Sequence, residues 1–202
     1  VSSLSEEFKE SQIKEITQED EIIADQILDL VSLPNEISDN IVLSTSLKYN
    51  DNNYRLNWES SNPEVLSNKG IITHQPQDEE VTLTGTISYN KERYSREFKI
   101  IVKAFDTTDM EKYLNDLTIE SEISSDIKLP TSYKMNGESY LVYWSSNNED
   151  ILSNTGKVGI ALKDTNVALT ATIAIDNVSI SKEFNVKVLK SSAEQILEII
   201  EN

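Results

Sequence analysis

Side chains that could carry out catalysis are scarce in this chain of 202 residues. It contains no cysteine and a single histidine, His74. Thiolate nucleophiles, disulfide bonds, cysteine-ligated zinc and iron–sulfur clusters are therefore excluded, as is a multi-histidine metal site within one chain. A serine nucleophile also needs a neighbouring base, and no such pair can be assigned. We predict that the chain is not an enzyme and has no catalytic and no cofactor-binding residues.

Carboxylates are the remaining groups that could do chemistry, and they occur in short acidic clusters. Asp78–Glu80, Glu19–Glu21 and Glu149–Asp150 could be paired carboxylates for glycoside hydrolysis or ligands for calcium. Because 35 residues are acidic, adjacent acids arise by chance, and no Asp-x-Asp-x-Asp-Gly loop is present. Asp106–Asp109 could also bind calcium, although helix capping accounts for the same residues. We predict no metal site and no cofactor, with calcium at Asp106–Asp109 as the alternative.

The net charge limits the class of partner. Lys and Arg number 18 against 35 Asp and Glu, which gives a formal charge of −17. Nucleic acid and anionic lipid surfaces both require clustered cations, so neither is expected as a partner. Residues 1–39 alone carry 11 acids and two lysines, which predicts a solvated helical face or, alternatively, docking to a basic partner. The longest apolar runs span only a few residues, so no membrane insertion is expected in this segment. We also expect a monomer.

An internal repeat sets the framework for these residues. Shifting the chain by 86 residues aligns Ile41–Lys103 with Ile127–Leu189 without a gap, and 24 of the 63 pairs are identical. A match of that length indicates a tandem duplication. The same shift places His74 on Ile160, and a position that can hold either residue is a surface or rim position, not that of a ligand or base.

Within each unit a helical pattern gives way to alternating strands. Ile23, Ile27, Leu30 and Val31 lie on one helix face, and a shorter helix is expected at Asp109–Asp116. Thr17-x-x-Asp20 and Ser191-x-x-Glu194 resemble capping boxes. Apolar residues then alternate with polar ones over 81–87 and 98–102, and again over 167–173 and 184–188. Alternation over seven or so short strands, with turns between them, is typical of an antiparallel β-sandwich.

We therefore predict a mainly β protein of two tandem antiparallel β-sandwiches, each preceded by a short α-helix. The expected boundaries are a helical leader at 1–19, a first unit at 20–105 and a second unit at 106–190. Residues 191–202 are expected to begin the helix of a third unit.

Several motifs in the two units resemble the atrophied bacterial immunoglobulin-like domain. They lie at Ile41–Leu43, Trp58–Gly70, Val81–Ile87 and Glu97–Val102, and recur at Ile127–Pro130, Trp144–Gly156, Val167–Ile173 and Glu183–Val188. The match departs from the pattern at Ser44, where the second unit has Pro130, and at Asn148-Glu149, where the first unit keeps Asn62-Pro63. The resemblance implies an immunoglobulin-like fold in a tandem array of a secreted or wall-attached bacterial protein. It implies no catalytic residue.

Matching positions in the two units predict the core and the turns. Trp58 and Trp144 could be core residues or platforms for sugar rings; Leu56 and Val142, two residues earlier, share their face and favour the core. The predicted structural core is Trp58, Trp144, Leu83, Leu169, Phe98 and Phe184. Gly70 and Gly156 are expected at turns that need a positive φ. The candidates for a surface binding role are Tyr143, Tyr89, Tyr94 and Tyr133.

The expected function is that of a non-catalytic spacer, stalk or accessory module of a larger bacterial secreted or cell-surface protein. Its partners would be the neighbouring domains of the same chain. The alternative is an adhesive module that binds a glycan or a host or cell-wall protein. The Asn-, Ile-, Lys- and Ser-rich composition indicates an AT-rich genome, so we expect a Gram-positive bacterium.

Overall fold

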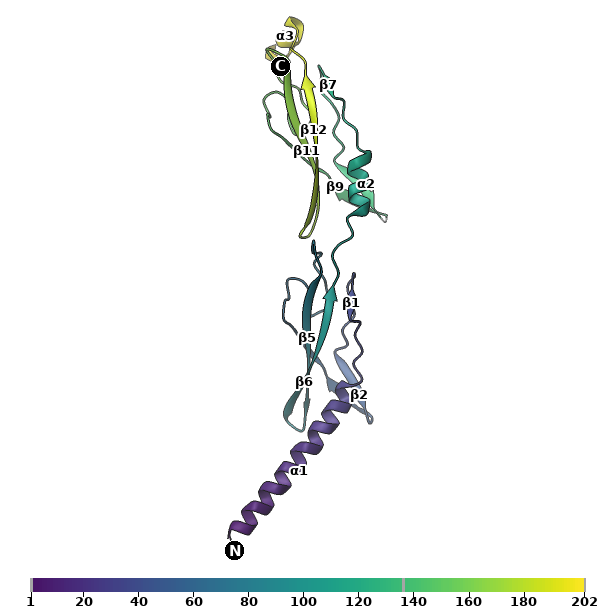
Figure 1. Ribbon diagram of the computed structural model, residues 1–202, viewed down its shortest axis with the longest axis vertical. Helices are drawn as coiled ribbons and strands as arrows, with labels where there is room; N and C mark the ends of the chain where they lie inside the picture. The colour runs from purple at the N-terminus through teal and green to yellow at the C-terminus, as the bar shows by residue number, and fades with distance from the viewer. Residues whose placement is uncertain (1, 136, 202) are drawn as a thin grey trace. The chain divides into compact units, whose positions relative to one another are not determined.

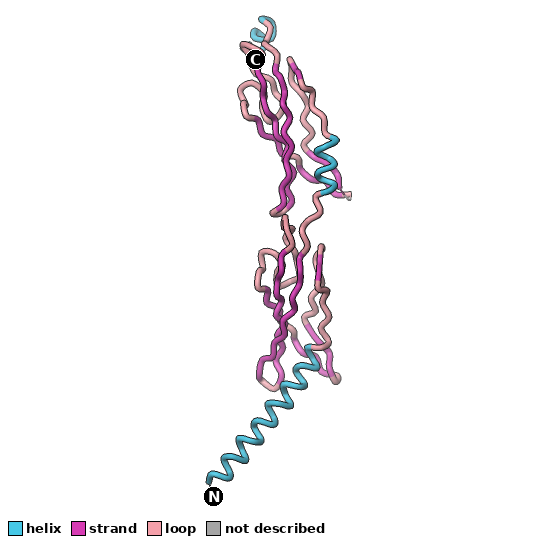
Figure 2. The backbone as a smooth tube through the Cα atoms, in the orientation of Figure 1, coloured by secondary structure: helices cyan, strands magenta, loops and turns pink. Residues whose placement is uncertain are grey.

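The computed structural model describes residues 2–135 and 137–201. The chain divides into two compact units, Val1–Phe105 and Asp106–Asn202. Each unit is built from one long β-hairpin, shorter strands beside it and a helix at its start (Figures 1 and 2). The prediction of a mainly β protein with two tandem immunoglobulin-like sandwiches is confirmed.

The first unit opens with one long helix, α1, at Ser2–Leu28. The sequence predicts a helical leader over 1–19 and then a short helix; in the structure the two form one continuous helix. Residues 2–21 contain neither Gly nor Pro, so nothing in the sequence interrupts a helix there. The predicted capping box at Thr17–Asp20 lies inside this helix and is wrong for the same reason. The N-terminal part of α1 extends beyond the strands of its own unit (Figure 1).

The main sheet of the first unit has four strands in the order β1-β6-β5-β4. The bounds are β1 Glu36–Ile37, β4 Asn57–Ser60, β5 Glu79–Tyr89 and β6 Glu92–Val102. β5 and β6 pair over their whole length, with Glu79 opposite Val102 and Tyr89 opposite Glu92. β1 pairs with β6 in parallel, so the sheet is not purely antiparallel as predicted. The parallel pair forms because the chain after α1 runs alongside the end of β6.

A small hairpin forms the second layer of the first unit. β2, at Ser46–Tyr49, pairs with β3, at Asn52–Arg55. Its two-residue loop, Asn50-Asp51, has φ of 44° and 60°. The loop between β5 and β6, Asn90-Lys91, likewise has positive φ at both residues. Such loops match the right-handed twist of the flanking strands and fix the register of both hairpins.

The core of the first unit lies between the main sheet and the elements that cover it. Alternate residues of β5 point inward, and those from Val81 to Ile87 are buried. One apolar cluster joins the sheet to the loops around Leu43 and Leu66, and a second joins it to α1 and the small hairpin. Trp58 contacts both clusters. The inner face is therefore filled from two sides, with this ring between them.

The second unit repeats this plan with a shorter opening helix, α2, at Thr108–Asp116. Its main sheet has the order β10-β11-β12-β7 and its second layer is the β8–β9 hairpin. The bounds are β7 Glu122–Ile123, β8 Ser132–Met135, β9 Glu138–Leu141, β10 Tyr143–Ser146, β11 Thr165–Ile175 and β12 Val178–Val188. Every strand pairing of the first unit recurs 86 residues later. The described part of each unit thus holds six strands, not seven, and two of them are 11 residues long.

The last helix, α3, spans Ala193–Glu201, within the segment where a helix is expected. Its capping box lies one residue later than predicted. The Ser192 amide donates to Gln195 Oε1 at 2.8 Å, and the Gln195 amide donates to Ser192 Oγ at 3.2 Å. Within residues 2–135 and 137–201, no helix is long and apolar enough to cross a membrane.

Candidate functional site

The C-terminal part of α1 lies against the inner face of the first unit. Ala24, Ile27 and Leu28 are buried there together with Leu56 and Ile87. Apolar contact of this kind holds the helix against the sheet. It restrains less well the rotation of the helix about its own axis and the position of its last turn. Polar contacts from β6 supply the remaining restraint.

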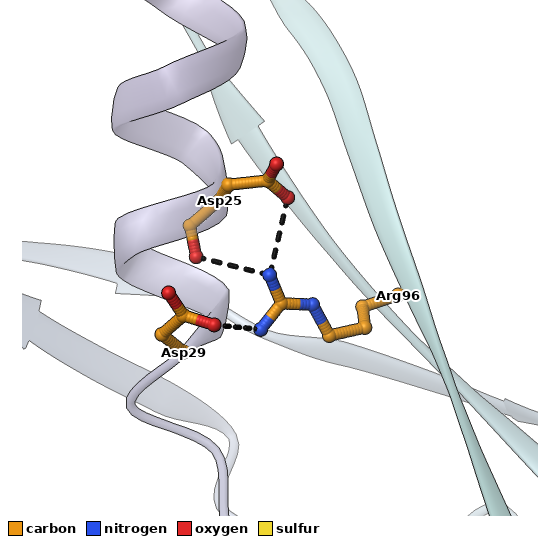
Figure 3. Close-up of polar contacts among 3 residues, drawn as sticks. All are labelled: Asp25, Asp29 and Arg96. Carbon is orange, nitrogen blue, oxygen red and sulfur yellow. Dashed lines mark hydrogen bonds and ion pairs between the residues drawn. The ribbon is translucent and has the colours of Figure 1, made fainter.

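Arg96 of β6 supplies these polar contacts, as Figure 3 shows. Its guanidinium donates to the Asp29 carboxylate, to Asp25 Oδ1 at 3.2 Å and to the main-chain carbonyl of Asp25 at 3.3 Å. The hydrogen bond to Asp29 is the largest of the effects that raise the pKa of Arg96 above its ordinary value. A cation at this end also complements the partial negative charge of a helix C-terminus.

Lys182 of β12 has the same place in the second unit. Its ammonium donates to three main-chain carbonyls at the end of α2: Leu114 at 2.7 Å, Asn115 at 3.1 Å and Leu117 at 3.3 Å. It also lies 4.9 Å from the centre of the Phe184 ring. Each unit therefore binds the end of its opening helix with one cation. We call Arg96 and Lys182 the helix-end cations.

The two tryptophans have matching environments. Trp58 Nε1 donates to the Ser44 carbonyl and Trp144 Nε1 to the Pro130 carbonyl, both at 2.8 Å. Both rings are half-buried and pack on the edge of the core. The residue identity at Ser44 and Pro130 differs, but only the carbonyl takes part, so the contact is unaffected.

The other predicted core residues fall into two groups. Leu83 and Leu169 are fully buried on the inner face. Phe98 and Phe184 are half-buried, and each packs on its tryptophan with ring centres 5.5 and 5.6 Å apart. These aromatic rings therefore pack at the side of the core and are not fully buried.

The turn glycines leave no room for a side chain. Gly70 and Gly156 have φ of +79° and +85°. A Cβ atom at either position would lie 2.1 or 2.2 Å from the carbonyl oxygen of Ile41 or Ile127. Glycine is needed here for both conformation and space.

The tyrosines predicted to lie on exposed faces do not share one environment. Tyr143 is 55% exposed. Tyr89 and Tyr94 are half-buried and pack against the cluster that holds α1, and Tyr133 is buried. Burial is the main cause that raises the pKa of Tyr94. The exposed placement is wrong for Tyr89, Tyr94 and Tyr133, because the long α1 and the helix α2 cover the faces on which they lie.

Two aspartates hold the chain where it leaves the main sheet. Asp78 accepts the Ala104 amide at 2.8 Å and also pairs with Lys103. Asp164, 86 residues later, accepts the Lys190 amide at 2.9 Å. Its partner is Lys187 at 3.2 Å. The pKa of Asp78 lies below its ordinary value, chiefly because of Lys103; that of Asp164 does so chiefly because of the Lys190 amide.

The candidate calcium segment is engaged in capping contacts. Asp106 Oδ1 accepts the amide of Thr108 at 2.9 Å and its hydroxyl at 2.6 Å. Thr107 donates to Glu111 at 2.6 Å. In the part of the chain that the structure describes, no three His, Cys, Asp or Glu side chains are grouped so that they could hold a metal ion. His74 is half-buried and lies 4.7 Å from the Phe105 ring, measured between ring centres.

The helix-end cations and Asp164 are not among the residues singled out from the sequence, and Asp78 is considered there only as part of an acidic cluster, not for its contacts with Lys103 and Ala104. One signal for them exists in the 86-residue alignment. Arg96 aligns with Lys182, so both units carry a cation on an otherwise apolar inward-facing row of the strand. Asp78 aligns with Asp164 in the same way.

Comparison with known proteins gives a match along most of the chain. The atrophied bacterial Ig domain family matches residues 25–105 and again residues 106–191. Among solved structures, the crystal structure of human protocadherin-24 EC1-2 is 13% identical, with a TM-score of 0.22; the match covers 78% of this chain and 95% of that one. None of the curated proteins compared with the chain matches it.

Proposed function

Because the chain belongs to the atrophied bacterial Ig domain family, we propose that it is a non-catalytic accessory module of a larger bacterial secreted or cell-surface protein. Its role is that of a spacer, which holds other domains of the same protein at a distance. Bacterial Ig-like domains usually occur in extracellular or surface proteins, and this supports the location.

The observation that carries the proposal is the equality of the two units. Their strand pairings and their tryptophan contacts repeat at one constant offset of 86 residues. Equal units give equal steps along an array, which is what a spacer requires.

The charged groups with shifted pKa values support a structural role. Arg96 holds α1, and Asp78 and Asp164 hold the chain after the main sheet. Shifted pKa values cluster at catalytic sites but also arise in structural ion pairs, and each of these groups has such a pair. The net charge of −17 supports a soluble monomer that repels its neighbours on a crowded surface. We propose further that the protein comes from a Gram-positive bacterium and that its partners are the neighbouring domains of the same chain.

The distance between equivalent positions of the two units tests the spacer role. The chain has no cysteine, so Glu97→Cys together with Glu183→Cys provides two unique sites for spin labels. Both residues are exposed and lie at the same repeat position. We expect pulsed electron paramagnetic resonance to give one narrow distribution of distances between the two labels. Its mean would be the step from one unit to the next.

A flexible insertion gives the matched control. Three residues, Gly-Ser-Gly, inserted after Phe105 should broaden the distribution without changing the unfolding of either unit. A distribution that is already as broad in the parent protein as in the insertion variant would show that the chain holds no fixed distance, and the spacer proposal would be wrong.

A further inference from the structure

The outer face of the main sheet differs in chemistry between the two units. In the second unit, two neighbouring rows cross β10, β11 and β12: Tyr143, Thr172 and Ser181 in one, and Ser145, Thr170 and Glu183 in the other. We call these six residues the outer platform. They alternate with the buried Leu169, Ala171 and Ile173, so they point away from the core. Figure 1 shows α2 and β9 together on one side of the β11–β12 hairpin.

The equivalent rows of the first unit are more polar and more acidic. They read Asn57, Thr86 and Ser95, and then Glu59, Thr84 and Glu97. The hydroxyl pair is common to both units: Thr86 and Ser95 lie 2.8 Å apart, and Thr172 and Ser181 lie 2.9 Å apart. The edge strand alone differs, where Tyr143 and Ser145 replace Asn57 and Glu59. Core packing does not determine the residue types at these four positions, because all four side chains are exposed.

An exposed aromatic ring beside a grid of hydroxyl groups is suited to a sugar chain. Tyr143 is 55% exposed, and it lies on β10, at the edge of the sheet. The apolar face of a pyranose ring can stack on the tyrosine, while its hydroxyls exchange hydrogen bonds with Ser145, Thr172 and Ser181.

Charge selects the class of sugar chain. The whole chain carries −17, which disfavours a polyanion as ligand. The outer platform holds one carboxylate, Glu183, and no cation. An uncharged polymer is complementary to such a face, whereas a basic peptide is better served by the more acidic face of the first unit. We propose that the outer platform of the second unit binds an uncharged polysaccharide through Tyr143. The proposal is independent of the spacer role.

Affinity electrophoresis of the full chain tests this proposal. The gels would contain mixed-linkage β-glucan, xyloglucan, galactomannan or amylopectin, with serum albumin as the mobility reference. We expect at least one of the four to retard the protein, equally at low and high salt. Tyr143→Asn, which copies the first unit, should weaken binding at least tenfold. Tyr143→Phe, which keeps the ring, should stay within threefold of the parent.

Two variants of the first unit complete the design. Asn57→Ala should leave binding unchanged. Asn57→Tyr with Glu59→Ser, added to Tyr143→Asn, should restore retardation, because it rebuilds the platform on the first unit. Thermal unfolding of every variant is the control for loss of fold. We expect unchanged unfolding temperatures, because the substituted side chains are exposed. No retardation by any of the four polymers would overturn the proposal. Undiminished binding by Tyr143→Asn would overturn it too, because the polymer would then be held without the ring.

Discussion

Arg96 and Lys182 lie 86 residues apart in the chain, and each binds the C-terminal end of the helix that precedes its own sheet. Arg96 reaches two aspartates and one carbonyl at the end of α1, whereas Lys182 reaches three carbonyls at the end of α2. The planar guanidinium suits several acceptors spread over a turn, and the ammonium suits carbonyls that converge on one point. Both units thus hold the end of the opening helix with a cation, which is a guanidinium in the first unit and an ammonium in the second.

Replacing Arg96 with Ala should lower the free energy of unfolding of the first unit by about 0.5–1.5 kcal/mol. The value is modest because the two aspartates are exposed and water screens the ion pairs. Arg93 on the same strand is exposed and gives the control: Arg93→Ala should cost less than about 0.5 kcal/mol. Urea unfolding at low and high salt measures both variants. Equal losses in the two would show that Arg96 does not anchor α1.

Replacing Lys182 with Met should loosen the end of α2 while keeping the apolar stem of the side chain. Three carbonyls lose their donor, and we expect a loss of about 1–2 kcal/mol in the second unit. Hydrogen exchange at the Leu117 amide, which donates to the Tyr113 carbonyl at 3.0 Å, should become faster. Lys163→Met, at an exposed site, is the control and should leave this amide unchanged. Unchanged exchange in Lys182→Met would contradict the anchor.

Asp78 should stabilise the first unit only while it is ionised. Lys103 and the Ala104 amide lower its pKa in the folded state from the ordinary value of 3.8, so its contribution is complete above that value. The contribution is lost as the pH falls through the lower folded-state pKa. The difference in unfolding free energy between the parent and Asp78→Asn should therefore be constant near neutral pH and shrink toward zero in acid.

The same experiment on Asp164→Asn should give the same sign in the second unit, because the Lys190 amide and Lys187 lower that pKa too. Glu64→Gln, an exposed acid, is the control for general effects of charge. A parent–variant difference that grows in acid would contradict the prediction for either aspartate.

Gly70 and Gly85 should respond differently to alanine. At Gly70 the added Cβ would meet the Ile41 carbonyl oxygen at 2.1 Å, at a φ of +79°. We expect Gly70→Ala to cost at least about 2 kcal/mol. At Gly85 the nearest atoms are ends of the Trp58 and Leu56 side chains, 3.1 and 3.2 Å away. The second unit already has Ala171 there, so Gly85→Ala should change the unfolding free energy by less than about 1 kcal/mol. Thermal unfolding ranks the two variants, and a reversed order would refute this account.

The parts of the fold that follow from local pattern could be predicted from the sequence. Strand alternation identified the buried Leu83 and Leu169, and the repeat identified Trp58 and Trp144 as equivalent. The helical state of residues 1–19 could be predicted, but their continuity with the next helix in one α1 could not, because the apolar pattern does not report where one helix ends and another begins. The half-buried state of Tyr94 depends on α1 covering it, which is a tertiary contact. The role of the helix-end cations depends on where the helix end lies relative to the sheet, and no local sequence pattern encodes that position.

The parallel pairing of β1 with β6 has a mechanical consequence. The Ile101 amide donates to the Asn35 carbonyl and the Lys103 amide to the Ile37 carbonyl, both at 2.8 Å. The same two bonds recur between β7 and β12. When tension pulls on the two ends of the chain, parallel strands near the two ends of a unit are drawn in opposite directions along their own axes. Both bonds of each pair are then loaded together in shear, not opened one after the other. Single-molecule extension should therefore give two unfolding peaks of similar force, one from each unit.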